Sequence, residues 1–339
     1  MSKSLPTIKE IAKRLNVSVS TVSRALNDHP RIGLRTKLRV QQLAKELSYE
    51  PNAQAIFFKQ KKTFVIGVII PSVREEFFSQ AISGIEMAAM EHHYTILFGQ
   101  SYDDPEKEKA VVDVMKKQRV DGLIISLSKH TKKFDHLLAL AKVSIPVVYF
   151  DRVPPFEKAN KVFCNLYDGT IEMISWLVNH GYRRIALING PDEMAASKER
   201  FKGYVDGLSK KRLKADMKLV VQTDFTKEKT LQAMQYLLSL KNKPNVIISF
   251  NDYVHMAAAQ YAHQQGVKIN KDIAFVSYAN LPITEYTAFP PLLSLEQYPY
   301  GQGEKAMQMM MQLLSSQNEN APERFYTEEL KTTLMKSLK

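Results

Sequence analysis

The sequence of 339 residues has almost no cysteine and no long apolar run. Its single cysteine, Cys164, cannot form a disulfide within the chain, so nothing calls for an oxidising compartment. The opening stretch MSKSLPTIKEIAKRL lacks the run of about 7–15 apolar residues that a secretory signal needs. No later stretch approaches the roughly 18 apolar residues that cross a bilayer. These absences predict a cytoplasmic protein that does not enter a membrane.

Catalytic motifs are also scarce. There is no G-x-S-x-G nucleophile elbow, no H-E-x-x-H zinc motif and no P-loop. The stretch GQGEKA at 301–306 matches G-x-G-x-x-A, but only 33 residues follow it, too few to complete a dinucleotide-binding unit. We therefore predict no enzymatic activity, no cofactor and no metal site.

Positive charge is abundant and unevenly spread. The formal net charge is +12, and residues 1–62 hold 13 Lys and Arg against 4 acids, whereas the remaining 277 residues carry only +3. Such a basic region is typical of binding to a polyanion, either nucleic acid or an anionic membrane surface. The lack of apolar runs favours nucleic acid. The length and the 45% of hydrophobic residues predict two or three domains.

The first fifty residues predict three short helices. Thr7 and Glu10 have the spacing of a capping box ahead of a helix at 8–15. Ser18 can cap a second helix, whose inward residues are predicted to be Val19, Val22, Ala25 and Leu26. A third helix, at about 35–47, is predicted to bury Leu38, Leu43, Ala44 and Leu47.

This arrangement predicts a helix-turn-helix whose second helix enters the DNA major groove. The outer face of that helix consists of Ser20, Thr21, Ser23, Arg24 and Asn27. Short hydroxyl side chains let a helix approach DNA closely, and Arg24 can then reach guanine O6 and N7 together. The alternative is a solvated helix that happens to be rich in serine. Position, basic charge and turn spacing favour the DNA-binding interpretation.

The next stretch, YEPNAQAIFFKQKKT at 49–63, predicts a short hinge helix. Asn52 can cap a helix that begins at Ala53 and ends near Lys59, which is too short to be stable without a partner. Phe58 beside Lys59 combines apolar bulk with phosphate-seeking charge, as in a wedge inserted into the minor groove. An aromatic pair packed against the next domain is an equally good interpretation.

Eight β-branched runs alternate with helical stretches over the rest of the chain. They lie at 64–70, 95–101, 122–128, 146–151, 184–190, 218–223, 246–251 and 273–279. Apolar strands separated by helices indicate parallel sheets that are covered on both faces. Two sets of four such runs predict two doubly wound α/β lobes.

Ligands of such folds bind beyond the carboxyl ends of the strands, and between two lobes this position becomes a cleft. The candidate residues at these ends are Phe77, Phe78, Asp151, Arg152, Asn251, Asp252, Ala279 and Asn280. Aromatic faces with a few polar groups suit a polyol or sugar. Purely structural roles are the alternative, because Asp252 can cap the following helix and Phe78 can belong to the core.

Together these features resemble the lac repressor and galactose repressor family of bacterial transcriptional regulators. The resemblance is carried by TIKEIAKRLNVSVSTVSRALN at 7–27, YEPNA at 49–53, RVDGLIIS at 119–126, HGYRRIALINGP at 180–191 and FPPLLSLEQ at 289–297. It implies a helix-turn-helix head, a hinge helix and two lobes like those of a periplasmic sugar-binding protein. A solute-binding protein, or an α/β enzyme fused to a DNA-binding head, are the alternatives.

The resemblance also implies roles for residues of the head and hinge. Val19, Ser20 and Arg24 fall on base-reading positions, and Ser23 falls on a phosphate-contacting position. Phe58 stands where the family usually has a minor-groove leucine, and Ile56 stands where an arginine is common. The DNA-contacting residues predicted in all are Thr7, Val19, Ser20, Thr21, Ser23, Arg24, Asn27, Asn52, Ala53, Phe58 and Lys59.

The same carry-over places an effector site in the cleft. Its predicted residues are Phe77, Phe78, Asp151, Arg152, Arg200, Phe225, Asn251 and Ala279. The family typically has an aspartate where this chain has Ala279, so the effector is expected to differ from a simple hexose. Met194 and Ala196 likewise lack the polar groups of purine-responsive members.

The implied domain organisation has four parts. We predict a head at 1–50, a hinge at 51–62, a first lobe of 63–164 plus 294–325, and a second lobe of 165–293 plus 326–339. The family is dimeric, and the chain ends without the leucine heptads of tetrameric members, so we expect a homodimer on a pseudo-palindromic DNA operator. The effector is expected to be a carbohydrate or a carbohydrate derivative.

Overall fold

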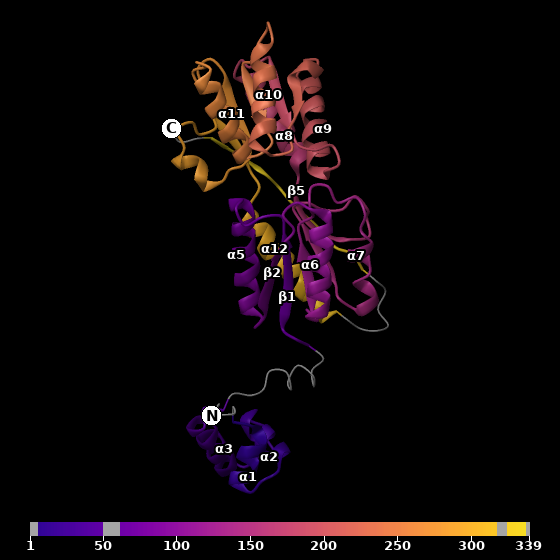
Figure 1. Ribbon diagram of the computed structural model, residues 1–339, viewed down its shortest axis with the longest axis vertical. Coiled ribbons are helices and arrows are strands. Elements are labelled where there is room, and N and C mark those ends of the chain that lie inside the picture. The colour runs from indigo at the N-terminus through magenta and orange to yellow at the C-terminus, as the bar shows by residue number, and fades with distance from the viewer. Residues whose placement is uncertain (1–5, 50–61, 317–323, 337–339) are drawn as a thin grey trace. The chain divides into compact units, whose positions relative to one another are not determined.

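The computed structural model describes residues 6–49, 62–316 and 324–336, and the chain divides into two compact units, residues 1–63 and 64–339 (Figure 1). Each unit has its own hydrophobic core. One cluster of buried side chains comes from the first unit alone, and four clusters come from the second unit alone. Each unit therefore has the apolar interior that independent folding requires.

The first unit contains α1 (Ile8–Leu15), α2 (Val19–Leu26) and α3 (Leu34–Glu46). The predicted caps are both confirmed, because Thr7 Oγ1 accepts a hydrogen bond from the Glu10 amide at 3.3 Å and Ser18 Oγ accepts one from the Thr21 amide at 3.0 Å. Asn16, with φ of 51°, ends α1 in the left-handed conformation and turns the chain into α2. The three helices form the predicted helix-turn-helix.

Two predictions about the core of this unit are wrong. Val19, predicted to face inward, is 41% exposed, because the first residue of α2 lies on the outer side of the turn. Leu38 is 56% exposed, and α3 packs instead through Val40 and Ala44. The predicted hinge, which includes Asn52, Ala53, Phe58 and Lys59, lies outside the described residues.

The second unit has two six-stranded sheets. The first sheet has the order β11-β5-β4-β3-β1-β2, with all neighbours parallel. Its strands are β1 (Val65–Ile70), β2 (Thr95–Gln100), β3 (Gly122–Ile125), β4 (Val147–Phe150), β5 (Asn160–Cys164) and β11 (Thr327–Leu330). Helices α5 (Glu76–Glu91) and α12 (Pro299–Ser315) share one apolar cluster with this sheet, and α6 (Pro105–Lys117) and α7 (Asp135–Leu138) share another. The sheet is thus covered on both faces.

The second sheet has the order β12-β10-β9-β8-β6-β7 and is parallel except for the β10–β12 pair. Its strands are β6 (Ile185–Asn189), β7 (Val220–Gln222), β8 (Val246–Ser249), β9 (Ala274–Ala279), β10 (Leu293–Glu296) and β12 (Thr333–Lys336). Helices α8 (Leu166–Asn179) and α9 (Ala195–Lys210) share one apolar cluster with it, and α10 (Lys227–Ser239) and α11 (Asp252–Gln264) share the other. The predicted pair of doubly wound lobes is confirmed.

The lobe boundaries differ from the prediction at the end of the chain. Strand β10 pairs with β9 in the second sheet, so residues 294–296 belong to the second lobe and not to the first. Strand β11 pairs with β5 in the first sheet, so residues 327–330 belong to the first lobe and not to the second. The chain therefore crosses between the lobes three times, after β5, after β10 and after β11.

Helices α5 and α12 cross unusually closely. A Cβ atom on Gly84 would overlap the carbonyl oxygen of Tyr300, and one on Gly303 would overlap the carbonyl oxygen of Ala81. Gly303 belongs to the GQGEKA stretch, so this glycine of the stretch serves helix packing. No helix among the described residues is long and apolar enough to cross a membrane.

Candidate DNA-contacting face and effector cleft

The outer face of α2 is chemically simple and accessible. Val19, Ser20, Arg24 and Asn27 are exposed, whereas Thr21 and Ser23 are half-buried. The described part of the chain gives the Arg24 guanidinium no ion pair and no side-chain hydrogen bond. The Arg24 guanidinium has no partner within that part of the protein and is flanked by short side chains. It can therefore approach base edges.

The other predicted head residues support this helix. Asn27 Nδ2 donates a hydrogen bond to the Ser23 carbonyl at 2.8 Å, and Thr21 Oγ1 lies 2.8 Å from Ser18 Oγ. Thr7 is exposed at the start of α1 and caps it. These contacts hold the backbone at both ends of α2 and leave its middle free for a ligand.

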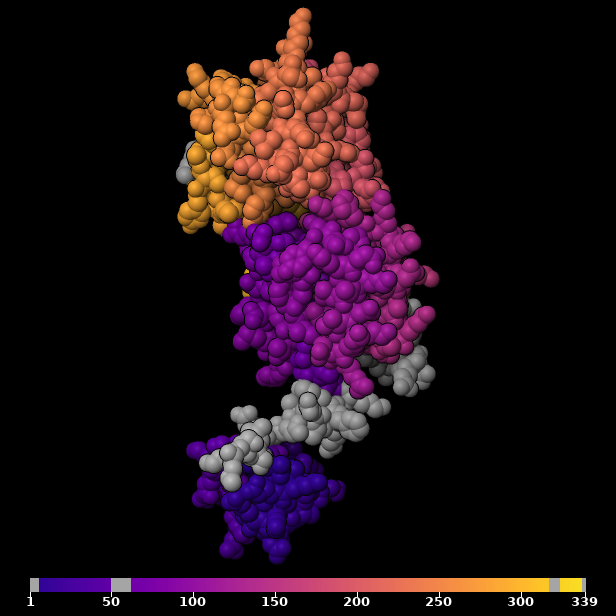
Figure 2. Space-filling view, in the orientation of Figure 1, coloured from indigo at the N-terminus to yellow at the C-terminus, as the bar shows by residue number. Residues whose placement is uncertain are grey.

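A cavity lies between the two lobes of the second unit, whose surfaces meet around a narrow indentation (Figure 2). About 450 Å³ of empty space lies within it, including open solvent at its mouth. It is lined by Glu75, Phe77, Phe78, Asp151, Arg152, Met194, Ala196, Arg200, Phe250, Asn251, Tyr253, Ala279, Leu281 and Gln297.

The structure brings seven of the eight predicted effector residues together in this lining. Asp151 and Arg152 follow β4, Asn251 caps α11 after β8, and Ala279 ends β9, as expected for carboxyl ends of parallel strands. Phe225 is the exception and does not line the cavity. Its ring centroid lies 4.5 Å from that of Phe250.

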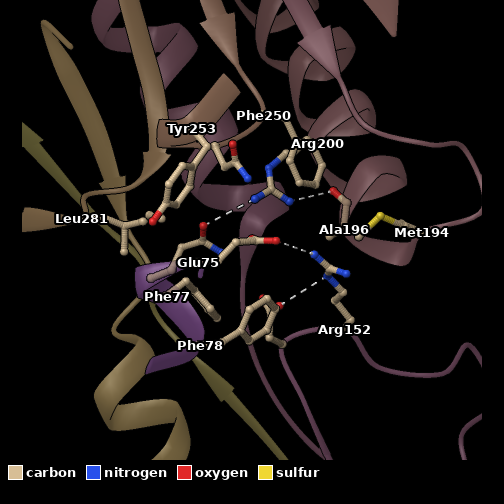
Figure 3. A pocket seen from close by; sticks show the side chains of 14 residues that line it. Glu75, Phe77, Phe78, Arg152, Met194, Ala196, Arg200, Phe250, Tyr253 and Leu281 are labelled. Atoms are coloured by element: carbon tan, nitrogen blue, oxygen red, sulfur yellow. Dashed lines mark hydrogen bonds and ion pairs between the residues drawn. The ribbon is translucent and has the colours of Figure 1, made fainter. Parts of the chain in front are cut away.

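Arg152 is neutralised within the site (Figure 3). Its guanidinium lies 2.5 Å from the Asp103 carboxylate and 4.0 Å from each of the Glu75 and Asp151 carboxylates, and it also stacks on the Phe78 ring. Burial by itself lowers the pKa of Arg152, but the three carboxylates outweigh it and raise the pKa. Burial also raises the pKa of Glu75, and that of Asp151 to about 6.

Arg200 is the second cation of the cleft, and it has a different environment. It is only 3% exposed and is stacked between the Phe250 ring at 4.1 Å and the Tyr278 ring at 4.4 Å. Its Nη2 donates to Gln297 Oε1 at 3.4 Å, and its Nε has no hydrogen-bond partner. Burial lowers the pKa of Arg200 to about 10. A buried donor without a partner is a group that a ligand can satisfy.

Three predicted effector residues have strained backbones. Asp151, Phe225 and Ala279 have φ angles of 55°, 73° and 96°, in a region that side-chain-bearing residues rarely adopt. Each is the last residue of a strand or follows one by a few positions. Strain of this kind, held by surrounding structure, concentrates at ligand sites.

Polar contacts join the lobes on both sides of the cavity. Lys129 Nζ donates to the Asp224 carbonyl at 2.8 Å, and Lys132 Nζ lies 2.9 Å from the Glu193 carboxylate. On the other side, the Tyr253 hydroxyl donates to the Arg74 carbonyl and accepts from the Glu76 amide, each at 3.0 Å. These contacts hold the cleft closed.

Several lining residues were not predicted. They are Glu75, Phe250, Tyr253, Leu281 and Gln297. All of them lie within two residues of a predicted position or, for Gln297, in the FPPLLSLEQ crossover stretch. Met194 and Ala196 were noted only for the polar groups that they lack. The described residues contain no cluster of three or more side chains that could hold a metal ion.

A helix-turn-helix unit followed by a two-lobed core with a closed cleft is the organisation of a ligand-controlled transcriptional regulator. Comparison with protein families agrees. Residues 7–52 match the family of bacterial regulatory proteins of the lacI type, and residues 63–332 match the periplasmic binding proteins and sugar-binding domain of the LacI family. The chain belongs to the LacI family.

The sequences of known repressors are similar to this chain over most of its length. The chain is 29% identical over 324 residues to the transcriptional repressor CytR of Escherichia coli K12, covering 96% of this chain and 94% of the relative. It is 29% identical over 320 residues to the repressor PurR of Klebsiella pneumoniae strain 342, covering 94% and 93%. The protein is thus a DNA-binding transcriptional repressor with an effector-binding core, and not an enzyme.

Solved structures show the same fold. The lac repressor dimer bound to operator and the anti-inducer ONPF matches with a TM-score of 0.84 and 22% identity, over 98% of each chain. The regulator CelR in complex with cellobiose matches with a TM-score of 0.72 and 24% identity, over 97% of this chain and 98% of that one.

Proposed function

We propose that this repressor acts in the bacterial cytoplasm, where it binds a pseudo-palindromic operator as a homodimer under the control of a carbohydrate-like effector. The observation that carries this proposal is the closed cleft, in which charged and aromatic groups from both lobes surround a small cavity. Binding to the chromosome requires the cytoplasmic location.

The free face of α2 supports DNA recognition by Val19, Ser20 and Arg24. Arg24 is the residue we assign to direct base contact, because a guanidinium can bond two guanine acceptors at once. Thr7, Thr21, Ser23 and Asn27 are assigned to phosphates and to the support of the helix. The roles of Asn52, Ala53, Phe58 and Lys59 in a hinge remain a prediction from the sequence.

Polar groups in the cleft support a polyol effector. Asp151 and Arg152 belong to the first lobe, whereas Arg200 and Asn251 belong to the second, so one ligand can bond to both. Sugar hydroxyls can accept from the unpartnered Arg200 Nε while apolar sugar faces contact Phe77 and Phe250. A ligand with different affinities for the open and closed cleft shifts their populations and thereby the affinity for DNA. The similar CelR was solved with cellobiose.

Exposed apolar side chains on neighbouring elements of the first lobe support a homodimer. Met87 and Met90 of α5 are 53% and 62% exposed, and Phe98 of the edge strand β2 is 40% exposed. A two-fold dimer places two heads on half-sites about one helical turn apart. The similar lac repressor was solved as a dimer on its operator.

The double variant Met87→Glu/Met90→Glu is expected to sediment as a monomer, because it places charge in the proposed interface. Analytical ultracentrifugation measures this. The matched control is Met217→Glu, at a methionine of the second lobe that is 59% exposed, and it is expected to stay dimeric. A dimeric double variant contradicts the proposed interface.

Selection of fragments of the source genome on the purified protein tests the proposed function as a whole. We expect a two-fold pseudo-palindrome upstream of a few operons, whose encoded enzymes then narrow the effector. Retention of all fragments alike, with a steep loss at higher salt, contradicts sequence-specific binding by the head.

A further inference from the structure

The end of the second lobe that lies farthest from the cleft is strongly basic. Helices α8, α9, α10 and α11 all end there, and the connections from them into β6, β7, β8 and β9 form that surface (Figure 1). These connections, residues 180–184, 211–219, 240–245 and 265–273, contain ten cations and two acids, a net charge of +8. We call the ten cations the basic pole: Arg183, Arg184, Lys211, Arg212, Lys214, Lys218, Lys241, Lys243, Lys268 and Lys271.

Neither overall composition nor the helix ends explain this concentration. The corresponding connections of the first lobe, residues 92–94, 118–121 and 139–146, contain only two cations and one acid. Carboxyl ends of helices favour nearby cations, but this effect acts on both lobes. Outside the basic pole and its two acids, residues 63–339 hold 24 cations and 29 acids, a net charge of −5. The basic pole is therefore segregated on one surface.

The four connections form one continuous row. The strand order β7-β6-β8-β9 places them side by side along the sheet edge, over about 15 Å at the usual strand spacing. Arg184 links three of them, because its Nη2 donates to the Asn242 carbonyl at 2.7 Å and its Nη1 lies 3.7 Å from the Asp216 carboxylate. Eight of the ten side chains are exposed.

Most of this charge is not neutralised by the protein. Among the described residues, the contact of Arg184 with Asp216 is the single ion pair of the basic pole. Lys211 donates to the Asn179 side chain and Arg183 donates to the Val178 carbonyl, which fixes their positions. The other seven side chains have no hydrogen bond or ion pair in the described part of the chain. They are free to bind an external anion.

The composition of this surface favours nucleic acid over protein or lipid. Met217 is the one large apolar side chain that is well exposed in the four connections. Protein interfaces depend on buried apolar anchors, and surface-bound lipid on inserted apolar groups. Duplex DNA offers a regular row of phosphates that needs only cations. We propose that the basic pole binds the phosphate backbone of duplex DNA independently of sequence, as a second DNA contact besides the head.

Fluorescence anisotropy on residues 64–339, the unit with its own hydrophobic cores, separates this contact from the head. The probe is an arbitrary duplex of about 30 base pairs at about 50 and 200 mM salt. The pole variant carries the substitutions Lys214→Gln, Lys218→Gln, Lys241→Gln and Lys243→Gln. The control variant removes four other exposed lysines through Lys133→Gln, Lys142→Gln, Lys227→Gln and Lys229→Gln.

The parent unit and the control variant are expected to bind the duplex with equal affinity. The pole variant is expected to bind at least about tenfold more weakly at low salt. Its salt slope is expected to be smaller by about 3.6, since each of the four lost phosphate contacts accounts for about 0.9. No binding by the parent unit, or equal weakening of both variants, overturns the proposal. So does pole-dependent binding to polyglutamate or anionic vesicles without binding to the duplex.

A second measurement uses the full chain and does not depend on the isolated unit. Protein loaded on an immobilised duplex is expected to capture a second, fluorescent duplex of unrelated sequence. Capture is expected to persist in the full-length control variant and to fall severalfold in the full-length pole variant. Equal capture by both variants overturns the proposal, whatever operator the head prefers.

Discussion

At the scale of single residues, we propose Arg24 as the main determinant of DNA sequence preference. We expect Arg24→Ala to reduce the preference for one base pair in each half-site by about 1–3 kcal/mol, because a bidentate contact is lost. Affinities for the selected operator and its single-base variants measure this. Arg39→Ala, at an exposed arginine of α3, is the control and should affect all sequences alike. Uniform loss in both variants contradicts the assignment of α2 as the recognition helix.

Asp252 couples stability to pH. Burial raises its pKa to about 7, although hydrogen bonds from the Leu281 amide and the Ser277 hydroxyl lower it. The unfolded chain loses this proton near pH 4, so the stabilising contribution of the group is present below pH 4 and is lost as pH rises to about 7.

We therefore expect Asp252→Asn, which cannot ionise, to gain stability relative to the parent between pH 4 and pH 8. The expected gain is on the order of 2–4 kcal/mol, at about 1.4 kcal/mol for each pKa unit. Urea unfolding of both proteins at the two pH values measures it. If the two proteins differ in free energy of unfolding by the same amount at pH 4 and at pH 8, the carboxyl of Asp252 ionises normally in the fold.

Comparison of the predicted effector residues with the cavity lining shows which of them could be predicted from the sequence. Six of the seven lining positions could be predicted because residues that follow strands, such as Asp151, keep a fixed place in doubly wound folds. The seventh, Arg200, lies within α9 and was predicted from the family resemblance alone. Phe225 does not line the cavity, and its loop adopts a φ of 73° that no sequence pattern indicates. The pairing of Arg152 with Asp103 likewise joins residues 49 positions apart.

At the scale of elements, the crossing of α5 and α12 determines the packing of the first lobe. We expect Gly84→Ala and Gly303→Ala each to lower the free energy of unfolding by about 1–3 kcal/mol or more, because the new methyl group meets backbone that cannot move freely. Gly301→Ala is the control on the same helix. Its Cβ would lie 3.6 Å from Tyr298 Cβ, an ordinary contact, so stability should stay equal or rise by up to about 1 kcal/mol.

Urea denaturation of the three variants measures these effects. Equal stability of Gly303→Ala and Gly301→Ala contradicts the close crossing. This outcome also bears on GQGEKA, whose Gly303 we assign to helix packing and not to a nucleotide site.

Most of the eight strands with β-branched runs, such as β1 and β8, could be predicted because burial on both faces demands apolar residues at nearly every position. The edge strands β2 and β7 are partly exposed, and their β-branched residues alone indicated them. Strands β5, β10, β11 and β12 were missed, because NKVFC, LSLE, TEEL and TLMK are short and include polar residues. Their pairing, and with it the correct lobe boundaries, depends on contacts between distant parts of the chain. Periodicity placed Val19 inward for a similar reason, since a helical repeat does not say where the partner helix begins.

At the scale of the whole molecule, the contacts across the cleft link the effector site to the position of one lobe relative to the other. Arg200 is central, because it bonds to Gln297 in the crossover between the lobes and retains an unpartnered Nε for a ligand. We therefore expect a molecule that bonds to Arg200 and to the first-lobe carboxylates together to change the balance between open and closed states.

The most direct test is the affinity of the full chain for its selected operator with and without the sugar that its operons indicate. We expect the sugar to change the operator affinity of the parent by about tenfold or more, a coupling free energy of about 1.4 kcal/mol or more. Arg200→Ala should bind the operator normally and show no response to the sugar. An unaltered response in Arg200→Ala would contradict control of DNA binding through the cleft.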